Sequence, residues 1–211
     1  MCATNPDRMK IICVGRNYAA HAAELGNEVP EDPILFMKPP SALLVNNKPL
    51  YYPEFTSDLH YEGELVLRIC KNGKYIAPEF AAGYYTEIGF GFDFTARDLQ
   101  AACKKAGRPW EIAKGFDNSA ALSKFIPLDS LANPDGISFR TVLNGKVVQE
   151  GNTRDLIFSF EQVISYASRY FKIQTGDLVF TGTPSGVGPV QIGDVLEGYI
   201  EDRKMIRCEI R

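Results

Sequence analysis

Two acidic residues, Glu62 and Glu64, stand one position apart in the segment HYEGE. From Leu59 to Arg68, apolar and polar positions alternate, which predicts a β-strand. Because the side chains of a strand point alternately to its two faces, Glu62 and Glu64 are expected on one face together with His60. Neighbouring carboxylates repel each other, so this face is a solvated surface, an acid/base pair or part of a metal site.

A third acidic residue, Asp93, ends a strand-like stretch that is rich in glycine and aromatic residues. A charge in such surroundings costs free energy if it is buried without a partner. With Glu62 and Glu64 it would supply three oxygen ligands and no sulfur, a set that favours Mg²⁺ or Mn²⁺ over Zn²⁺. The spacing does not show whether the three carboxylates meet, so a solvated face stays open as the alternative.

His21 and Glu24 lie three residues apart in the segment HAAEL, where the pattern predicts a short helix. Such positions are neighbours on a helix, and a carboxylate beside an imidazole fixes its tautomer and raises its basicity, as a general base requires. An exposed polar helix face is the alternative. The other histidine, His60, is expected either to support a metal ligand by a hydrogen bond or to be an ordinary strand residue.

Lys114 follows an apolar stretch, and we expect it to be either a partly buried cation facing the carboxylates or a surface lysine. The loop TGTPSGVGP, residues 181–189, contains neither a G-K-[ST] phosphate-binding motif nor a G-x-S-x-G motif. Its backbone N–H groups and the hydroxyl of Thr183 suit a substrate carboxylate. A plain glycine and proline turn is the alternative for this loop.

Short strands and a few helices are expected to position these residues. The clearest pattern is a hairpin around Asn144-Gly145, and a second hairpin is expected at Asn72-Gly73. Further strands are expected within residues 9–14, 34–40, 48–53, 59–68, 84–94, 176–180 and 193–210.

Three helices are expected: one capped by Asn17 and ended by Gly26, one capped by Thr95, and one around Phe160 to Ala167. Many short strands with scattered helices favour a mainly β fold with some α structure, a barrel or a sandwich. The length of 211 residues suits one domain, which we expect to span residues 1–211.

Composition limits the class of protein. The net charge of −3 and the lack of a basic block argue against a nucleic-acid partner. No segment has the apolar length that crosses a membrane, and the N-terminal residues do not resemble a signal or transit peptide. The five cysteines form no C-x-x-C motif, which disfavours a zinc ribbon or a disulfide framework. We therefore expect a cytoplasmic protein with free thiols.

Six segments occur in an order that resembles a known family: VGRNYAAHAAEL, ILFMKPPSAL, HYEGELVL, GFDFTARDLQ, PWEIAKGFD and FTGTPSGVGPV. They resemble the signature segments of the fumarylacetoacetate hydrolase superfamily, and more closely its single-domain acylpyruvate hydrolase and oxaloacetate decarboxylase branch. The resemblance covers nearly the whole chain. It implies a mixed β-sandwich roll with a short, mobile lid helix, and a homodimer.

The resemblance also implies roles for particular residues. Glu62, Glu64 and Asp93 would bind Mg²⁺ or Mn²⁺, and Lys114 would contact the substrate. Thr183 would bind the substrate carboxylate. The dyad of His21 and Glu24, on the lid helix, would activate water. The remaining family positions would bind substrate in ways that the resemblance does not define: Arg16, Lys38 and Gln100.

The activity that the resemblance implies is the cleavage of a C–C bond in a small 2-oxo acid. A 3-acylpyruvate would be hydrolysed to pyruvate and a carboxylic acid, or oxaloacetate would lose CO₂. Both reactions produce a pyruvate enolate, which a metal ion stabilises as a Lewis acid. The alternative within the family is an isomerase or tautomerase of a 2-hydroxy-dienoate (2-hydroxyhepta-2,4-diene-1,7-dioate type) or of the oxaloacetate enol. A protein that binds metal or oxo acids without catalysis is a third hypothesis.

Overall fold

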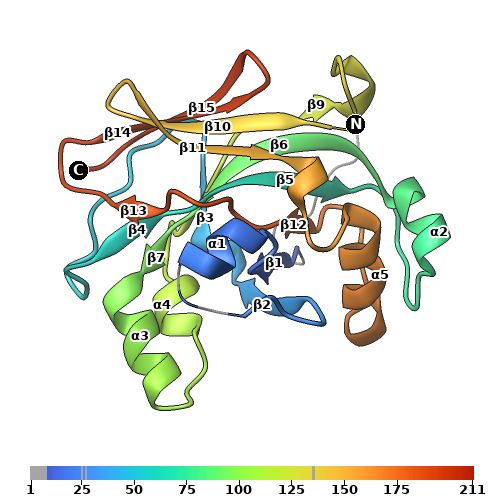
Figure 1. Ribbon diagram of the computed structural model, residues 1–211, viewed down its shortest axis with the longest axis horizontal. Coiled ribbons are helices and arrows are strands. Elements are labelled where there is room, and N and C mark those ends of the chain that lie inside the picture. Colours follow the sequence, from blue (N-terminus) through green and yellow to red (C-terminus); the bar gives the residue numbers. More distant parts are fainter. Residues whose placement is uncertain (1–8, 25, 27, 135) are drawn as a thin grey trace.

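A long curled sheet is the main element of the fold (Figure 1), and three of the residues singled out above, Lys38, Glu64 and Asp93, lie on it. The computed structural model of the chain describes residues 9–24, 26, 28–134 and 136–211. Within this part, β1 runs parallel to β12, and β3 runs parallel to β8, while the other neighbours in the sheet are antiparallel. In spatial order its strands are β2 (Ile34–Lys38), β1 (Ile11–Gly15), β12 (Leu178–Phe180), β5 (Gly63–Ile69), β6 (Tyr85–Asp93), β8 (Ala120–Leu122) and β3 (Leu43–Val45), with β9 (Ile126–Pro127) beside β6.

A second, antiparallel sheet packs over the long one. Its strands, in order, are β11 (Lys146–Asn152), β10 (Ser138–Leu143), β14 (Val195–Ile200) and β15 (Arg203–Glu209). Between the sheets, Phe90 of β6 packs against Phe139 of β10, with ring centroids 6.2 Å apart. A Cβ atom at Gly198 would lie 2.3 Å from the Phe90 ring, so β14 approaches β6 closely because this residue has no side chain.

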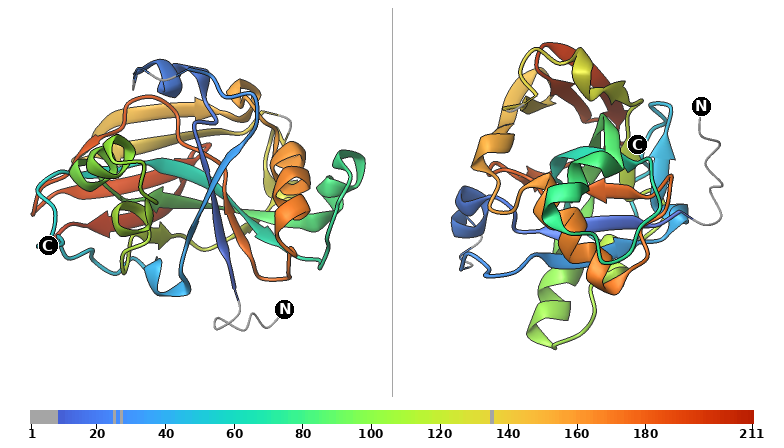
Figure 2. Two further views of the ribbon diagram at one scale, coloured as in Figure 1. Left: turned by 90° about the horizontal axis from the view of Figure 1, so that it is seen from below. Right: turned by 90° about the vertical axis from the view of Figure 1, so that its right-hand side faces the viewer.

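A third, small sheet joins β13 (Gly188–Pro189), β4 (Leu59–Tyr61) and β7 (Thr95–Ala96). The helices are α1 (Ala19–Glu24), α2 (Pro78–Ala81), α3 (Arg97–Lys105), α4 (Glu111–Lys114) and α5 (Phe160–Tyr170). Short 3₁₀ turns are η2 (Pro40–Ala42), η3 (Ala82–Tyr84), η4 (Leu128–Ser130) and η5 (Thr153–Asp155). The views of Figure 2 place α2 and α5 side by side at one end of the molecule. No described helix has the length and apolar character needed to cross a membrane.

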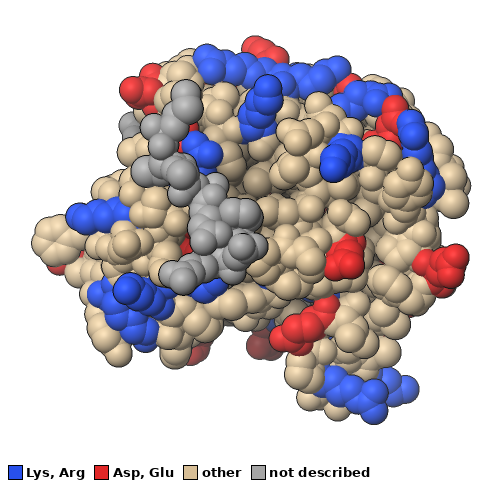
Figure 3. Space-filling view, turned by 180° about the vertical axis from the view of Figure 1, so that it is seen from behind, with Lys and Arg blue, Asp and Glu red and all other residues tan. Residues whose placement is uncertain are grey.

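Several sequence predictions are confirmed. The chain is mainly β with some helix. The hairpin of β10 and β11 turns at Asn144-Gly145, where both residues have positive φ angles. Helix α5 begins with a capping box, in which Ser159 and Gln162 bond each other's backbone N–H. Seen from behind, much of the surface is uncharged, with basic side chains along the top edge, at the lower left and at the lower-right tip, and with scattered acidic side chains between them (Figure 3).

The strand predicted over residues 59–68 is wrong in one respect, because the chain leaves the strand geometry at Glu62. Residues before the break, in β4, pair with β7 and β13, whereas those after it, in β5, join the long sheet. The backbone carbonyl of Glu62 accepts a hydrogen bond from the N–H of Asp93. The break therefore joins the small sheet to the long one at the site of the acidic residues.

Two further strand predictions are wrong. The segment after Asn72-Gly73 forms no hairpin strand, because Gly73 exchanges backbone hydrogen bonds with Ile173 and the chain enters α2 at Pro78. The partner of β5 is β6 instead. In the segment 48–53, Leu50 forms only an isolated bridge.

Both predicted helix caps are wrong as well. The side chain of Asn17 bonds to the backbone of Phe158 and Thr181, so it joins distant loops rather than capping α1. Thr95 lies in β7, and its hydroxyl donates to the carbonyl of Asp93. Helix α3 begins two residues later, at Arg97.

Candidate active site

The three carboxylates of Glu62, Glu64 and Asp93 lie together, with one oxygen of each within 4.8 Å of the others. Glu64 is on β5 and Asp93 ends β6, which is the antiparallel neighbour of β5. The break at Glu62 brings a third carboxylate to the same place. All three residues are buried. The structure therefore resolves the question that spacing left open, since these carboxylates do meet.

Three basic side chains surround the carboxylates. The Nζ atom of Lys114 lies 2.8 Å from Glu62 and 2.7 Å from Asp93. Lys38 Nζ lies 2.7 Å from the other oxygen of Asp93. Arg97 Nη2 lies 2.5 Å from the other carboxylate oxygen of Glu62. Each basic group pairs with a carboxylate, as buried charges require.

Lys38 contacts the carboxylate cluster at Asp93, from outside the pocket described below. Its side chain is fully buried, and its ammonium also donates to Ser119 and to the carbonyls of Phe94 and Lys114. It does not line the pocket described below. The predicted substrate contact of Lys38 therefore has no support in this arrangement, which instead assigns the residue to holding Asp93 in place.

The carboxylates of the cluster differ in acidity. Burial, with the charges of Asp93 and Glu62, raises the pKa of Glu64 well above its ordinary value. Burial alone would also raise the pKa of Glu62, but Lys114 and Arg97 outweigh it and hold that pKa far below the ordinary value. Although burial opposes its charge, the neighbouring carboxylates raise the pKa of Lys114 to about 12. Glu64 is thus the carboxylate that lacks a cation of its own.

A narrow pocket opens above this cluster. It is bounded by the end of β1, by α1, by one face of α3 and by the loop after β12. Most of the predicted site residues line it, among them His21, Arg16, Gln100 and Lys114. Its complete lining is Val14, Gly15, Arg16, His21, Phe36, Glu62, Glu64, Arg97, Gln100, Lys104, Trp110, Lys114 and Thr183. Seven candidates from distant parts of the sequence therefore converge on one cavity.

The predicted dyad is present in α1. His21 is buried, and its Nδ1 atom lies 3.3 Å from Oε2 of Glu24. The carboxylate of Glu24 also accepts a hydrogen bond from the backbone N–H of Gly186, at 3.0 Å. Since Nδ1 is engaged by Glu24, the other ring nitrogen, Nε2, is the one left for a ligand. Glu24 therefore holds the imidazole and attaches α1 to the 181–189 loop.

The loop holds the cluster in a way that the sequence did not predict. The N–H of Gly182 donates to Glu64 at 2.7 Å. The hydroxyl of Thr183 donates to the carbonyl of Gly63 and accepts from Gln149. Because its proton is already donated, the Thr183 hydroxyl has only acceptor capacity left, and its predicted contact with a substrate carboxylate stays a prediction.

His60 does not join the pocket. Its Nε2 atom lies 2.8 Å from Asp58, and within the described residues neither nitrogen bonds to Glu62 or Glu64. Burial and the nearby charge of Arg97 lower the pKa of His60 in spite of the Asp58 carboxylate. The predicted hydrogen bond from His60 to a metal ligand is therefore wrong, because the ring turns to Asp58.

Arg97 is the most important residue that sequence reasoning missed. It stands in the first turn of α3, where a single arginine is usually solvated. Its spacing from Gln100 and Lys104, three and seven residues on, is the signal that could have identified it, since such positions share a helix face. Arg97 also donates to Gln100 at 2.7 Å. These residues form one wall of the pocket.

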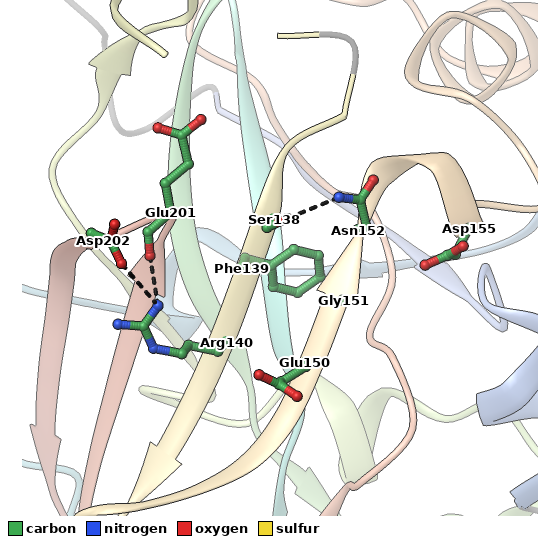
Figure 4. A pocket seen from close by; sticks show the side chains of 9 residues that line it. All are labelled: Ser138, Phe139, Arg140, Glu150, Gly151, Asn152, Asp155, Glu201 and Asp202. Atoms are coloured by element: carbon green, nitrogen blue, oxygen red, sulfur yellow. Dashed lines mark hydrogen bonds and ion pairs between the residues drawn. The ribbon is translucent and has the colours of Figure 1, made fainter. Parts of the chain in front are cut away.

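A second, wider hollow lies beside β10 and β11, with a volume of about 530 Å³ (Figure 4). Arg140 lies in it, 3.7 Å from the Asp202 carboxylate and bonded to the carbonyl of Glu201. Glu150 and Asp155 also line it. None of the predicted site residues lies there, so we assign the chemistry to the narrower pocket.

Comparison with known proteins identifies the family of the chain. Residues 10–211 match the family model described as fumarylacetoacetate (FAA) hydrolase, C-terminal. The chain belongs to the fumarylacetoacetate hydrolase family. Within the family, it is 43% identical over 188 residues to oxaloacetate tautomerase YcgM of Escherichia coli, covering 89% of this chain and 86% of that protein.

Two further members of the family are informative. Oxaloacetate decarboxylase, mitochondrial, of Dictyostelium discoideum is 41% identical over 189 residues, which cover 89% of this chain and 87% of that protein. The crystal structure of fumarylpyruvate hydrolase from Pseudomonas aeruginosa, in complex with Mn²⁺ and pyruvate, has a TM-score of 0.90. It is 39% identical, over 95% of this chain and 88% of that one. The family, its fold and its single-domain branch are thus confirmed as predicted.

Proposed function

We propose that this protein is a divalent-metal-dependent enzyme that converts the enol of oxaloacetate to its keto form. The observation that carries the proposal is the convergence of three buried carboxylates and Lys114 beneath one pocket. The name of the similar E. coli protein, oxaloacetate tautomerase, supports the choice of reaction.

The residues of the cluster fit a hard divalent cation. They offer carboxylate oxygens alone, which Mg²⁺ and Mn²⁺ prefer. Within the described part of the chain, Glu64 receives only the hydrogen bond from Gly182, so its carboxylate keeps lone pairs for a ligand. Once bound by Glu62, Glu64 and Asp93, the cation would supply Lewis-acid polarisation of the 2-oxo group and its carboxylate.

Charge balance favours an anionic substrate. Lys38, Lys114 and Arg97 already offset the three carboxylates, so a divalent cation gives the cluster a formal surplus of two positive charges. A 2-oxo dicarboxylate carries two negative charges, and the carboxylate at its 2-oxo end offsets part of this surplus. Lys114, which keeps its proton because its pKa is raised, then provides a fixed positive charge beside the oxygen atoms of the substrate.

Tautomerisation moves a proton between the enol oxygen and the adjacent carbon and needs no activated water. The pocket is narrow, with a free volume of about 30 Å³, and so leaves little room for water. This suits a reaction that does not use water. A four-carbon acid enters only if lining side chains or α1 move, and their return excludes bulk water.

The second candidate is hydrolysis of a 3-acylpyruvate, with oxaloacetate decarboxylation as a related reaction. The contact of His21 with Glu24 favours it, because a held imidazole can take a proton from water. That water adds to the acyl carbonyl, and collapse of the adduct breaks the C–C bond, which releases the acyl part as a carboxylic acid and leaves the bonding electron pair on the enolate of pyruvate. The name of the similar fumarylpyruvate hydrolase is consistent with this reaction.

The experiment compares enol-oxaloacetate, keto-oxaloacetate and acetylpyruvate as substrates, with Mg²⁺, with Mn²⁺ and with EDTA. We expect metal-dependent ketonisation of the enol that is lost in EDTA and in Glu64→Ala. His21→Ala separates the candidates: ketonisation should persist in this variant, whereas hydrolysis should fall by about 10²-fold or more. Ketonisation that survives both EDTA and Glu64→Ala would overturn the proposal.

The assembly and the cellular location of the protein are further proposals. We propose a homodimer from the family resemblance, to be tested by light scattering of the purified protein. The name of the D. discoideum relative places that protein in mitochondria, and the E. coli name specifies no compartment. A cytoplasmic location for this chain stays a prediction.

A further inference from the structure

Helix α3 presents one face to the pocket. Arg97, Gln100 and Lys104, at positions i, i+3 and i+7, all line it. Since a helix rises by about 1.5 Å per residue, Lys104 stands roughly 10 Å along the axis from Arg97. Arg97 reaches the carboxylate cluster, whereas Lys104 is exposed at the pocket mouth. The face therefore runs from the cluster to the entrance.

The basic residues of the pocket fall into two groups. The deeper ones, Lys114 and Arg97, pair with carboxylates of the cluster. The other two, Arg16 and the exposed Lys104, line the same pocket, but among the described residues no carboxylate lies within 4.0 Å of either. The pocket thus carries two positive charges that the cluster does not use.

The Lys104 side chain contacts an aromatic ring of the same pocket. Its ammonium lies 5.5 Å from the centroid of the Trp110 ring, which also lines the pocket. Partial burial and the nearby charges of Arg16 and Arg97 lower the pKa of Lys104. Crowded cations of this kind are stabilised by an anion that binds between them.

We propose that Lys104, together with Arg16, binds the second carboxylate of a 2-oxo dicarboxylic acid and so selects dicarboxylates over 2-oxo acids with an uncharged end. The inference rests on the proposed function, because it takes the 2-oxo acid end of the substrate to lie over Glu62, Glu64 and Asp93. In that pose the far end of the substrate points along α3 toward Lys104. Lys104 acts on specificity and takes no part in proton transfer.

The test measures dissociation constants by calorimetry in the presence of Mn²⁺ for two ligands of similar shape. Oxaloacetate carries a carboxylate where 4-methyl-2-oxopentanoate carries an isopropyl group. We expect the unmodified protein to bind oxaloacetate at least about tenfold more tightly, and Lys104→Met to remove most of that preference. Binding of 4-methyl-2-oxopentanoate should change less than about twofold, and Lys104→Arg should restore the preference.

The control variant is Lys105→Met, which removes the same charge one position along α3 from a residue that does not line the pocket. It should bind both ligands as the unmodified protein does. The inference is overturned if Lys104→Met weakens both ligands equally, if it changes neither, or if Lys105→Met has the same effect. Failure of the proposed function gives a different result, since the unmodified protein would then not ketonise enol-oxaloacetate with Mn²⁺.

Discussion

Lys114 donates a hydrogen bond to Glu62 at 2.8 Å, between residues that are both buried and 52 positions apart in the sequence. The ammonium also bonds to Asp93, so one cation joins two of the three carboxylates. The chain thereby keeps like charges together without a ligand. Glu64 is left as the member of the cluster whose charge is offset least.

Replacing Lys114 tests this pairing. Lys114→Met leaves Glu62 and Asp93 with fewer positive partners, and removal of one member of a buried ion pair costs about 3–5 kcal/mol. We expect the free energy of unfolding in EDTA, measured with urea, to fall by that amount. Lys105→Met, on the exposed side of α3, should change it by less than about 0.5 kcal/mol. Equal stability of the two variants would show that Lys114 does not stabilise the cluster.

The raised pKa of Glu64 predicts how stability and metal affinity depend on pH. A carboxyl whose pKa is higher in the folded state stabilises the fold below its unfolded pKa, about 4.3, and loses this contribution as the pH rises through the folded pKa. Glu62, with a lowered pKa, acts in the opposite direction only in more acidic solution. In EDTA, stability should therefore decline as the pH rises above the unfolded pKa of about 4.3 and through the raised pKa of Glu64.

Glu64→Gln should remove most of that decline, because the amide does not titrate. For the same reason, Mn²⁺ affinity of the unmodified protein should increase with pH, since the cation displaces the Glu64 proton. Urea unfolding and calorimetric titrations at several pH values measure both effects. A stability profile that Glu64→Gln leaves unchanged would contradict the assignment.

Two glycines with positive φ angles, Gly186 in the 181–189 loop and Gly193 after it, should respond differently to substitution by alanine. Gly186 has a φ of +95°, and a Cβ atom there would lie 2.1 Å from the carbonyl oxygen of Val148. Gly193 has a φ of +98° but has no heavy atom within 4 Å of that position. Gly193→Ala should cost about 1 kcal/mol of unfolding free energy from backbone strain alone. Gly186→Ala should cost clearly more and should displace the N–H that bonds Glu24; equal costs would count against the close packing.

The bond from Gly186 to Glu24 predicts a role for Glu24 beyond the imidazole. Glu24→Ala should speed hydrogen exchange of the α1 amides and lower any acylpyruvate hydrolysis by about 10²-fold, with little effect on ketonisation. Glu28→Ala removes a nearby exposed carboxylate and is the matched control. Unchanged exchange in Glu24→Ala would mean that other contacts hold α1 in place.

The sequence predicted the residues of the site better than the scaffold that positions them. The alternation around Glu64 and the hairpin at Asn144-Gly145 are local patterns, and both elements form where expected. The break at Glu62 is not local, because it depends on a hydrogen bond from Asp93, 31 residues later. Pairing between distant segments also explains why Gly73 bonds to Ile173 rather than turning a hairpin.

The sequence also could not predict which basic residues would pair with the buried carboxylates. An arginine in a first helical turn has the pattern of a solvated residue, and only the packing of α3 against β4 and β7 brings Arg97 to Glu62. Lys38 precedes two prolines at the end of a strand, a position that indicates nothing about burial. Its contact with Asp93 follows from the fold alone.

The most direct test is a calorimetric titration of EDTA-treated protein with Mn²⁺, for the unmodified chain and for Glu64→Ala. The account predicts one ion per chain in the unmodified protein and a loss of affinity of about 10²-fold or more in the variant, which should fold as well as the unmodified protein. Ketonisation of enol-oxaloacetate should return in proportion to the ion bound. Equal Mn²⁺ affinity in both proteins would contradict a metal site at Glu62, Glu64 and Asp93.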